Sequence, residues 1–229
     1  MSSRNDIDRQ FGETLVNWTP PPKPSKSPLI GRYARLEPLR ADHSPALLNA
    51  NRQDQAGLMW SYLPYGPFDT LDNYQAWVSA AAKSDDPLFF AIVDQTTEDA
   101  IGVASYLRIE PNNGAIEVGH IAYSPLLQRS RMATEAMFLM MQNAFALGYR
   151  RYEWKCDSLN MPSVNAAKRL GFQYEGTFRQ ATVYKGRNRD TSWFSIIDQD
   201  WHHMEAEYRR YLQPSNFDPE GQQLTPLSL

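Results

Sequence analysis

Cysteine, histidine and long apolar runs are scarce in this sequence. The chain has 229 residues with one cysteine, Cys156, and four histidines. A single cysteine forms no internal disulfide, which favours a reducing compartment. No stretch approaches the roughly 18 successive apolar residues that cross a bilayer, and the amino-terminal residues lack the apolar segment of a secretory signal. We therefore expect a cytoplasmic protein with no membrane partner, in which Cys156 is an inert strand residue.

A strong excess of charge of either sign is also missing. The formal net charge is −3, which gives no general attraction to nucleic acid or anionic lipid. The basic cluster of Lys185, Arg187 and Arg189 is too short to predict a nucleic-acid partner. His202 and His203 are adjacent on an expected helix and point apart, so we expect no metal site.

The chain divides by composition into three parts. Residues 1–28 form a proline-rich amino-terminal extension ending in "WTPPPKPSKSP", residues 29–213 form one domain, and residues 214–229 are expected to be a flexible tail. Within the domain, strands precede a strand–helix–strand–helix–strand order. This order predicts a single α+β domain with a mixed central sheet of about seven strands and helices on both faces. We expect a monomer or a homodimer.

The clearest helix carries an apolar stripe from Ala133 to Phe145 and ends at Gly148. Its methionines are expected to be core. The segment before it, "SPLLQRSRMATEA" (124–136), follows an apolar strand and therefore forms a strand–turn–helix junction. Free N–H groups and a partial positive charge at such a junction bind anions. Arg129 and Arg131 stand where glycines are usual in such loops; they either add charge to an anion site or are ordinary surface residues.

Two segments together resemble the GNAT acetyltransferases. The family's loop pattern is Q/R-x-x-G-x-G/A, and here the first and last positions match while the middle glycine is Arg131. The downstream pattern N-x-x-S…A-x-R-L-G-F-x-x-E-G resembles the branch of the ribosomal-protein N-terminal alanine/serine acetyltransferases, over roughly residues 30–200. The matching residues of the two segments are Gln128, Arg129, Ser130, Arg131, Met132 and Ala133, and then Asn160, Ser163, Ala167, Arg169, Leu170, Gly171, Phe172, Glu175 and Gly176.

The resemblance implies a V-shaped split between two strands and acetyl-CoA as co-substrate, with no metal. The acetyl group would pass by direct attack, in a ternary complex, to a primary amine of a protein or peptide N-terminus or of a small molecule. The pyrophosphate would lie on the amides of residues 129–134. Arg131 in place of glycine implies that position 131 keeps ordinary backbone angles. The cofactor-binding residues are then Ile121, Ala122 and Tyr123 for the pantetheine and thioester, and Gln128, Arg129, Ser130, Arg131, Met132, Ala133, Thr134, Asn160 and Ser163.

A base is useful because an α-amine has a pKa of about 8 and a lysine amine one of about 10.4. Glu117 is the candidate, acting directly or through a water. Its neighbours Ile116 and Val118 favour desolvation, which would raise the pKa of the carboxyl group. Alternatively, Glu117 faces solvent or pairs with an arginine, and His120 is the rival base.

The general acid of the family is commonly a tyrosine four residues before the glycine of the "GF" pair, and here that position is Ala167. Ser163 is the candidate replacement, with Asn160 positioning the cofactor or a water. Ser163 could equally cap its helix. The missing tyrosine and loop glycine also motivate an alternative, a catalytically weakened CoA-binding regulatory module.

The acceptor site is expected at the aromatic segment "MWSYLPYGPF" (59–68). Its aromatic side chains wall an acceptor pocket or fold over the core. The basic cluster at 185–189 could attract an acidic acceptor or the phosphates of CoA, or be solvated. The expected acceptor residues are Trp60, Tyr62 and Tyr65, with Trp154 and Tyr184 from later strands.

Overall fold

The structure is a computed structural model that describes residues 12 and 14–229. Residues 1–11 and 13 of the expected amino-terminal extension lie outside the described residues. The described part of the extension is mostly exposed but touches the domain at two points, since Pro21 is buried and Trp18 lies against the turn at Gly114.

One eight-stranded sheet organises the domain, with the strand order β1-β2-β3-β4-β5-β6-β8-β7. Among the described strands, β5 and β6 pair in parallel and every other neighbouring pair is antiparallel. The predicted α+β class with a mixed sheet is confirmed. The prediction of about seven strands missed a two-residue edge strand, β1. The strands are β1 (Leu29–Ile30), β2 (Ala34–Pro38), β3 (Leu88–Asp94), β4 (Ala100–Glu110), β5 (Ala115–Tyr123), β6 (Arg151–Asp157), β7 (Gln173–Tyr184) and β8 (Arg187–Ile197).

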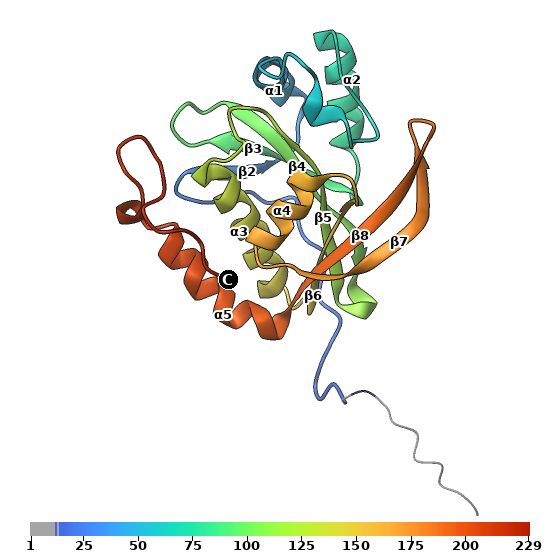
Figure 1. The fold of residues 1–229 in the computed structure, drawn as a ribbon, viewed down its shortest axis with the longest axis vertical. Coiled ribbons are helices and arrows are strands. Elements are labelled where there is room, and N and C mark those ends of the chain that lie inside the picture. The colour runs from blue at the N-terminus through green and yellow to red at the C-terminus, as the bar shows by residue number, and fades with distance from the viewer. Residues whose placement is uncertain (1–11, 13) are drawn as a thin grey trace, which may run out of the picture.

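Helices cover both faces of the sheet (Figure 1). Helices α1 and α2 pack together, with α1 against β4, while α3 packs against β1, β2, β5, β6 and α5, and α4 packs against β6 and β7. None of the helices in residues 12 and 14–229 has the length and hydropathy of a membrane span. The bounds are α1 (Ser44–Asn51), α2 (Leu71–Ala81), α3 (Arg131–Ala146), α4 (Met161–Arg169) and α5 (Asp198–Tyr211).

Two apolar cores follow from this arrangement. The methionine stripe of α3 is fully buried in the larger core, as the sequence predicts, with Met137, Met140 and Met141 at its centre. The smaller core lies under α1 and α2 and includes Trp60 and Tyr74. Each large side chain buried in this way stabilises the fold by about 1.5–3 kcal/mol.

The parallel pairing of β5 with β6 stops halfway along both strands. Residues pair from Ala115 with Arg151 as far as Val118 with Trp154. Beyond that point β5 stays paired with β4, after a bulge that leaves His120 in the left-handed region at φ 49°, while β6 stays paired with β8. The two strands therefore diverge, and the expected V-shaped split is present.

The carboxy-terminal segment 214–229, expected to be flexible, instead folds back onto the domain. Phe217 is buried and its ring meets Tyr33 and Tyr211 edge-on. The side chain of Asn216 donates to the carbonyls of Tyr211 and Thr225. A polar, proline- and glycine-containing composition suggested mobility, but Phe217 and Asn216 anchor this segment, and hydrogen bonds with α5 add to their contacts.

Glu135 ties α3 to the start of the sheet. Its buried carboxylate accepts hydrogen bonds from the backbone N–H groups of Arg32, Tyr33 and Ala34 at 2.9, 2.6 and 2.7 Å. Gly31 is required beside it, since a Cβ there would lie 2.6 Å from the carboxylate. One side chain thus fixes both the β1–β2 turn and the position of the first turns of α3.

We expect Glu135→Ala to lower the free energy of unfolding by about 3 kcal/mol, because it removes the acceptor of three backbone N–H donors, of which that of Ala34 is buried and those of Arg32 and Tyr33 are partly buried. Chemical denaturation of the variant beside wild type measures this loss. Glu220→Ala is the matched control, since Glu220 is exposed and should change stability little. Equal stability of the two variants would show that the carboxylate does not hold the turn.

Candidate active site

The amino-terminal end of α3 has free backbone donors. Ser130 is the N-cap, and its hydroxyl oxygen accepts from the N–H of Ala133 at 3.1 Å. Among the described residues, the N–H groups of Arg129, Arg131 and Met132 have no hydrogen-bond partner. Such donors at the positive end of a helix can hold an anion such as a pyrophosphate.

The two arginines of this turn differ in conformation and contacts. Arg131 is the first residue of α3 and has ordinary angles, whereas Arg129 takes the left-handed conformation with φ 57°. The guanidinium of Arg131 lies 4.3 Å from the ring centre of Tyr33 and 5.4 Å from that of Phe217. Arg131 therefore holds the carboxy-terminal segment against the sheet, while Arg129 is exposed, with no described partner for its charge.

Other residues of the expected cofactor set have structural partners. The side-chain amide of Gln128 donates to the carbonyl of Tyr123 at 2.8 Å, which ties the turn to the end of β5. The hydroxyl of Thr134 accepts from Arg169 at 3.1 Å. Ile121, Ala122 and Tyr123 lie on β5 beyond its last pair with β6, and Tyr123 leads directly into the turn.

Asn160 and Ser163 begin α4 on the other side of the split. Asn160 is the N-cap, and its side-chain oxygen accepts from the N–H of Ser163 at 3.2 Å. The hydroxyl oxygen of Ser163 accepts from the indole N–H of Trp154 at 3.0 Å. Burial raises the pKa of Cys156, and a hydrogen bond from Ser163 opposes that rise. Ala167, where a tyrosine is common in this family, is fully buried.

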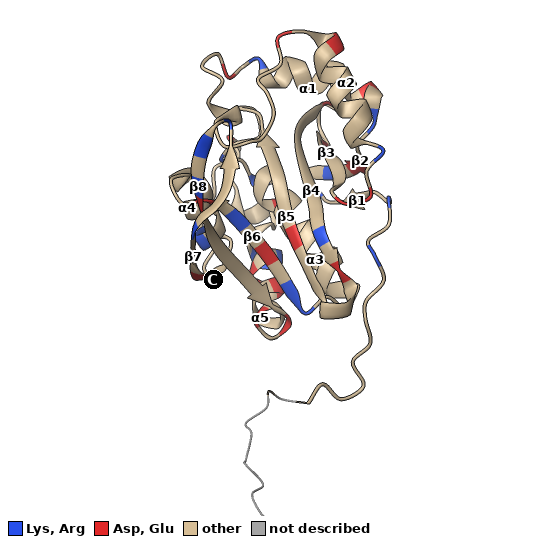
Figure 2. Ribbon diagram, turned by 90° about the vertical axis from the view of Figure 1, so that its right-hand side faces the viewer, with Lys and Arg blue, Asp and Glu red and all other residues tan. Residues whose placement is uncertain are grey.

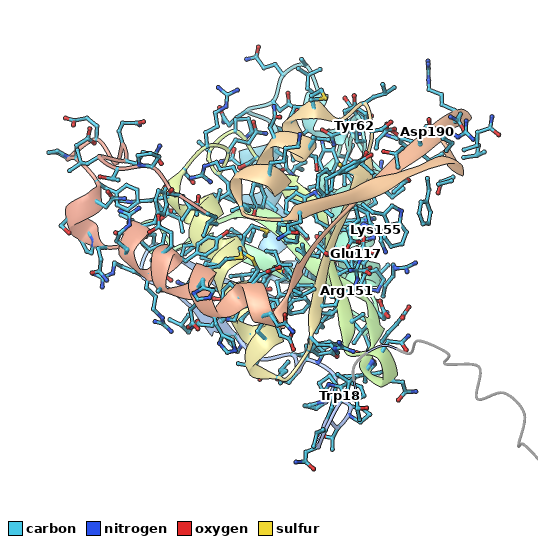
Figure 3. The ribbon with its side chains drawn as sticks, turned by 60° about the horizontal axis from the view of Figure 1, so that its bottom comes forward. Trp18, Tyr62, Glu117, Arg151, Lys155 and Asp190 are labelled. Carbon is cyan, nitrogen blue, oxygen red and sulfur yellow. The ribbon has the colours of Figure 1, made fainter. Side chains whose placement is uncertain are left out.

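On the face of the sheet opposite Trp154 and α4, charged residues of alternating sign pair between β4, β5, β6 and β7. Figure 2 marks basic and acidic positions along these strands in blue and red. Lys155 on β6 lies 2.8 Å from both Glu117 and Glu153, and Arg108 lies 3.3 Å from Glu117. We call this set the charge row. Figure 3 shows Arg151, Lys155 and Glu117 close together along it. In the order in which they pair, its members are Glu175, Arg151, Glu153, Lys155, Glu117 and Arg108.

Glu117 is buried and paired, and both facts affect its acidity. Burial raises the pKa of the carboxyl group, while Lys155 and Arg108 oppose that rise. Pairing with an arginine was one of the alternatives for Glu117, and the structure has that pair alongside the one with lysine.

His120 lies on the same face as Glu117, at the bulge in β5. Its ring stacks on Tyr65 at 5.7 Å and meets Phe89 at 5.1 Å. Burial lowers the pKa of His120, so the imidazole is neutral at physiological pH. Its Nδ1 is buried and has no hydrogen-bond partner among the described residues. Those residues include no group of three or more His, Cys, Asp or Glu side chains that could hold a metal ion.

The expected acceptor residues do not all lie together. Trp60 is buried in the smaller core, so this part of the aromatic segment folds over the core. Trp154 is buried in the larger core, on the face opposite Lys155, and supports Ser163. Tyr62 and Tyr184 bridge neighbouring segments through the carbonyl of Leu159 and the carboxylate of Asp157. Tyr65 reaches the candidate site through its stack on His120.

A cavity of about 310 Å³ adjoins the charge row beneath the β7–β8 hairpin. Trp193 and Phe178, which the sequence analysis did not select, form its aromatic side. Trp193 pairs with Lys155 between β8 and β6 and therefore lies on the same face. From the sequence, the alternation of "RDTSWFS" indicates only that Trp193 and Phe194 point to opposite faces. The residues that line the cavity are Arg108, Glu117, Lys155, Phe178, Ala181, Thr182, Arg189, Thr191 and Trp193.

Comparison with known proteins assigns the family. A family model described as "Acetyltransferase (GNAT) domain" matches residues 34–173, more than half of the chain. The protein therefore belongs to the GNAT acetyltransferase family.

Individual relatives agree with this assignment. The crystal structure of a GCN5-related N-acetyltransferase from Brucella melitensis is 48% identical, with a TM-score of 0.91, over 93% of this chain and 97% of that one. The uncharacterized N-acetyltransferase p20 of Bacillus licheniformis is 30% identical over 49% of this chain and 63% of its own length, which is less than two-thirds. RimL, a ribosomal L7/L12 alpha-N-protein acetyltransferase solved with coenzyme A, is 22% identical, with a TM-score of 0.64, over 76% of this chain and 99% of that one. This last likeness shows the fold alone.

The left-handed angle of Arg129 gives a prediction about stability. We expect Arg129→Gly to change the free energy of unfolding by less than about 1 kcal/mol, because relief of strain and the greater freedom of the unfolded chain nearly cancel. Arg129→Val should lower it by about 1–2 kcal/mol, since a β-branched residue is disfavoured at positive φ. Thermal and denaturant unfolding of the three proteins test this order. Equal stability of the glycine and valine variants would show that residue 129 does not take the left-handed conformation.

Proposed function

We propose that the protein transfers an acetyl group from acetyl-CoA to a primary amine in a ternary complex. The observation that carries the proposal is the position of the free N–H groups of α3. In the sequence, these N–H groups come in the turn and helix start that follow the part of β5 that has separated from β6. A split between strands that ends at an anion-binding turn suits an extended cofactor with a pyrophosphate. The GNAT family relationship supports the same cofactor.

Acetyl-CoA supplies a thioester carbonyl to the reaction. The lone pair of the amine forms the C–N bond, the C–S bond breaks, and the sulfur leaves with the bonding electron pair. The nitrogen gives up one proton to a base, and the departing sulfur takes up one proton. The protein's residues therefore have to bind the cofactor, accept a proton on the acceptor side and donate one on the cofactor side.

The residues that would hold the cofactor fit it on two grounds. The unpartnered N–H groups of Arg129, Arg131 and Met132 are donors suited to phosphate oxygens. Arg129 adds an exposed side-chain charge beside them. Arg131 is already stacked on Tyr33 and Phe217, so its main contribution is its backbone N–H and the anchoring of the carboxy-terminal segment.

Glu117 is our proposed base. Its burial makes it a stronger proton acceptor than a solvated carboxylate, while Lys155 and Arg108 keep it ionised and ready to accept a proton. His120 is the second candidate, because it is neutral and makes no described hydrogen bond. Lys155 pairs with Glu117, so removal of Lys155 should change the pKa of a Glu117 base more than that of a His120 base.

Ser163 is the proposed proton donor to the departing sulfur. Its oxygen accepts from the indole of Trp154, which strengthens the hydroxyl as a donor. Asn160 holds Ser163 in place through the helix cap. Ser163 would thus protonate the sulfur in place of the tyrosine that is common in this family at the position of Ala167.

Release of free thiol from acetyl-CoA tests the proposal directly. The purified protein is incubated with acetyl-CoA and a panel of amino acids, polyamines and N-terminal peptides. Thiol release that depends on an amine supports the transferase. Tight binding of coenzyme A with no thiol release for any amine would instead identify a catalytically weakened CoA-binding regulatory module.

The pairing of Glu117 predicts a shift in the pH profile. A base works when it is deprotonated, so kcat/KM falls as the pH drops through its pKa. Lys155→Met removes a cation that opposes the effect of burial. The pKa of Glu117 should rise, and the acid limb of the profile should move to higher pH. Arg108→Gln should give a smaller shift in the same direction, because Arg108 is half exposed.

Lys83→Met is the control, since Lys83 is exposed at the end of α2 and should leave the profile unchanged. An acid limb that stays in place in both Lys155→Met and Arg108→Gln would exclude Glu117 as the titrating base. A limb that disappears in His120→Gln would then assign the role to His120.

A further inference from the structure

The cavity beneath the β7–β8 hairpin holds one cation, Arg189, that no residue in the described part of the chain neutralises. The charge row contributes three cations and three anions, which pair with one another. Arg189 is an additional cation in the cavity wall. Its Nε donates to the hydroxyl of Thr191 at 3.2 Å, and its guanidinium lies 5.7 Å from the ring centre of Tyr184.

Arg189 makes no salt bridge among the described residues, although carboxylates occur on the same strands. Asp157 accepts from the hydroxyl of Tyr184 and from the N–H of Leu159. One carboxylate oxygen of Asp190 accepts from the N–H of Gln180 and from the amide of Asn188. The outer N–H groups of the Arg189 guanidinium therefore remain available for an anionic group of a ligand.

The same cavity also has an apolar side. The rings of Phe178 and Trp193 lie 4.8 Å apart, and Ala181 adjoins them. The Nζ of Lys155 lies 3.6 Å from the ring centre of Trp193, which keeps the indole fixed beside Glu117. An acceptor in this cavity would meet an aromatic surface, the free guanidinium of Arg189 and the carboxylate of Glu117.

The size of the cavity favours a small acceptor. A volume of about 310 Å³ lies at the lower end of the range of roughly 300–1,000 Å³ for small-molecule sites. Lys185, at the tip of the hairpin, donates to the carbonyl of Trp60 at 2.8 Å. Tyr62 donates to the carbonyl of Leu159 at 3.1 Å. These two bonds tie the hairpin, which lines the cavity, and the loop before α4 to the aromatic segment.

We propose that the acceptor is a small amine that carries a carboxylate, of the size of a free amino acid, with its carboxylate on Arg189 and its amine toward Glu117. This inference rests on the proposed acetyl transfer and narrows it to one substrate class. The fixed charge of Arg189 selects the acid, and Phe178 and Trp193 favour an apolar side group.

The test compares each common L-amino acid with its carboxamide, at saturating acetyl-CoA, by the rate of thiol release. We expect kcat/KM to be about 10- to 100-fold higher for the acids that react best than for their amides, as for loss of one charge-assisted contact. A neighbouring carboxylate raises the pKa of the amine, so the acid is the less reactive nucleophile at neutral pH. A preference for the acid must therefore come from binding.

Variants of Arg189 show whether this side chain makes the selection. Arg189→Gln should remove most of the acid preference while leaving the rate with the amides and the KM for acetyl-CoA nearly unchanged. Arg189→Lys should retain part of the preference. Arg187→Gln is the matched control, since Arg187 is an exposed arginine of the same hairpin outside the cavity wall. Thermal unfolding of each variant checks that it is folded.

Two different failures can be told apart. Thiol release that is as fast with amides or N-terminal peptides as with the acids would overturn the acidic acceptor but leave the transferase intact. If Arg189→Gln lowered kcat/KM equally for acids and amides, this result would also overturn the acidic acceptor and leave the transferase intact. Absence of thiol release with every amine, while coenzyme A still binds, would overturn both proposals.

Discussion

The separation of β5 from β6 after Val118 and Trp154 is the constraint on which the candidate site depends. Both strands continue past this point, but each follows a different partner: β5 stays with β4 and β6 stays with β8. A bulge at His120 bends β5 at the place where the pairing ends. The amino-terminal ends of α3 and α4 lie beside the split on one face of the sheet. The charge row lies beside it on the other face. In the proposed ternary complex, cofactor and acceptor would approach the same few residues of β5 from opposite sides.

The charge row is costly to bury, and its arrangement offsets that cost. Glu117 and Lys155 are both largely buried, and each makes close contacts to opposite charges on neighbouring strands. Buried charges are tolerated when they are paired in this way, whereas removal of one partner leaves the other uncompensated. The row is neutral within itself, and Arg189 in the wall of the adjoining cavity makes no salt bridge among the described residues. Electrostatics on this face affects the acidity of Glu117 and, in our proposal, the choice of acceptor.

Much of the fold could be predicted from the sequence, because it is encoded locally. Turn and helix-cap residues can be recognised in two short segments, 128–133 and 160–176. The apolar residues of α3 recur at helical spacing, which predicts its buried side. The pairing of Glu117 with Lys155 could not be read, since it depends on the register between strands 38 residues apart. Trp154 was expected in the acceptor pocket, although its alternation with Lys155 indicates the opposite face. Phe217 anchors the last segment through tertiary contacts that its polar neighbours conceal.

The most direct test of this account is a titration of the ¹⁵N-labelled protein with coenzyme A, followed by the chemical shifts of its backbone amides. The account predicts that the largest changes fall on residues 119–123 of β5 and on 129–134 at the start of α3, with smaller changes at Asn160 and Ser163. Changes confined to the charge row or to the carboxy-terminal segment, with the amides of Arg129, Arg131 and Met132 unmoved, would contradict it.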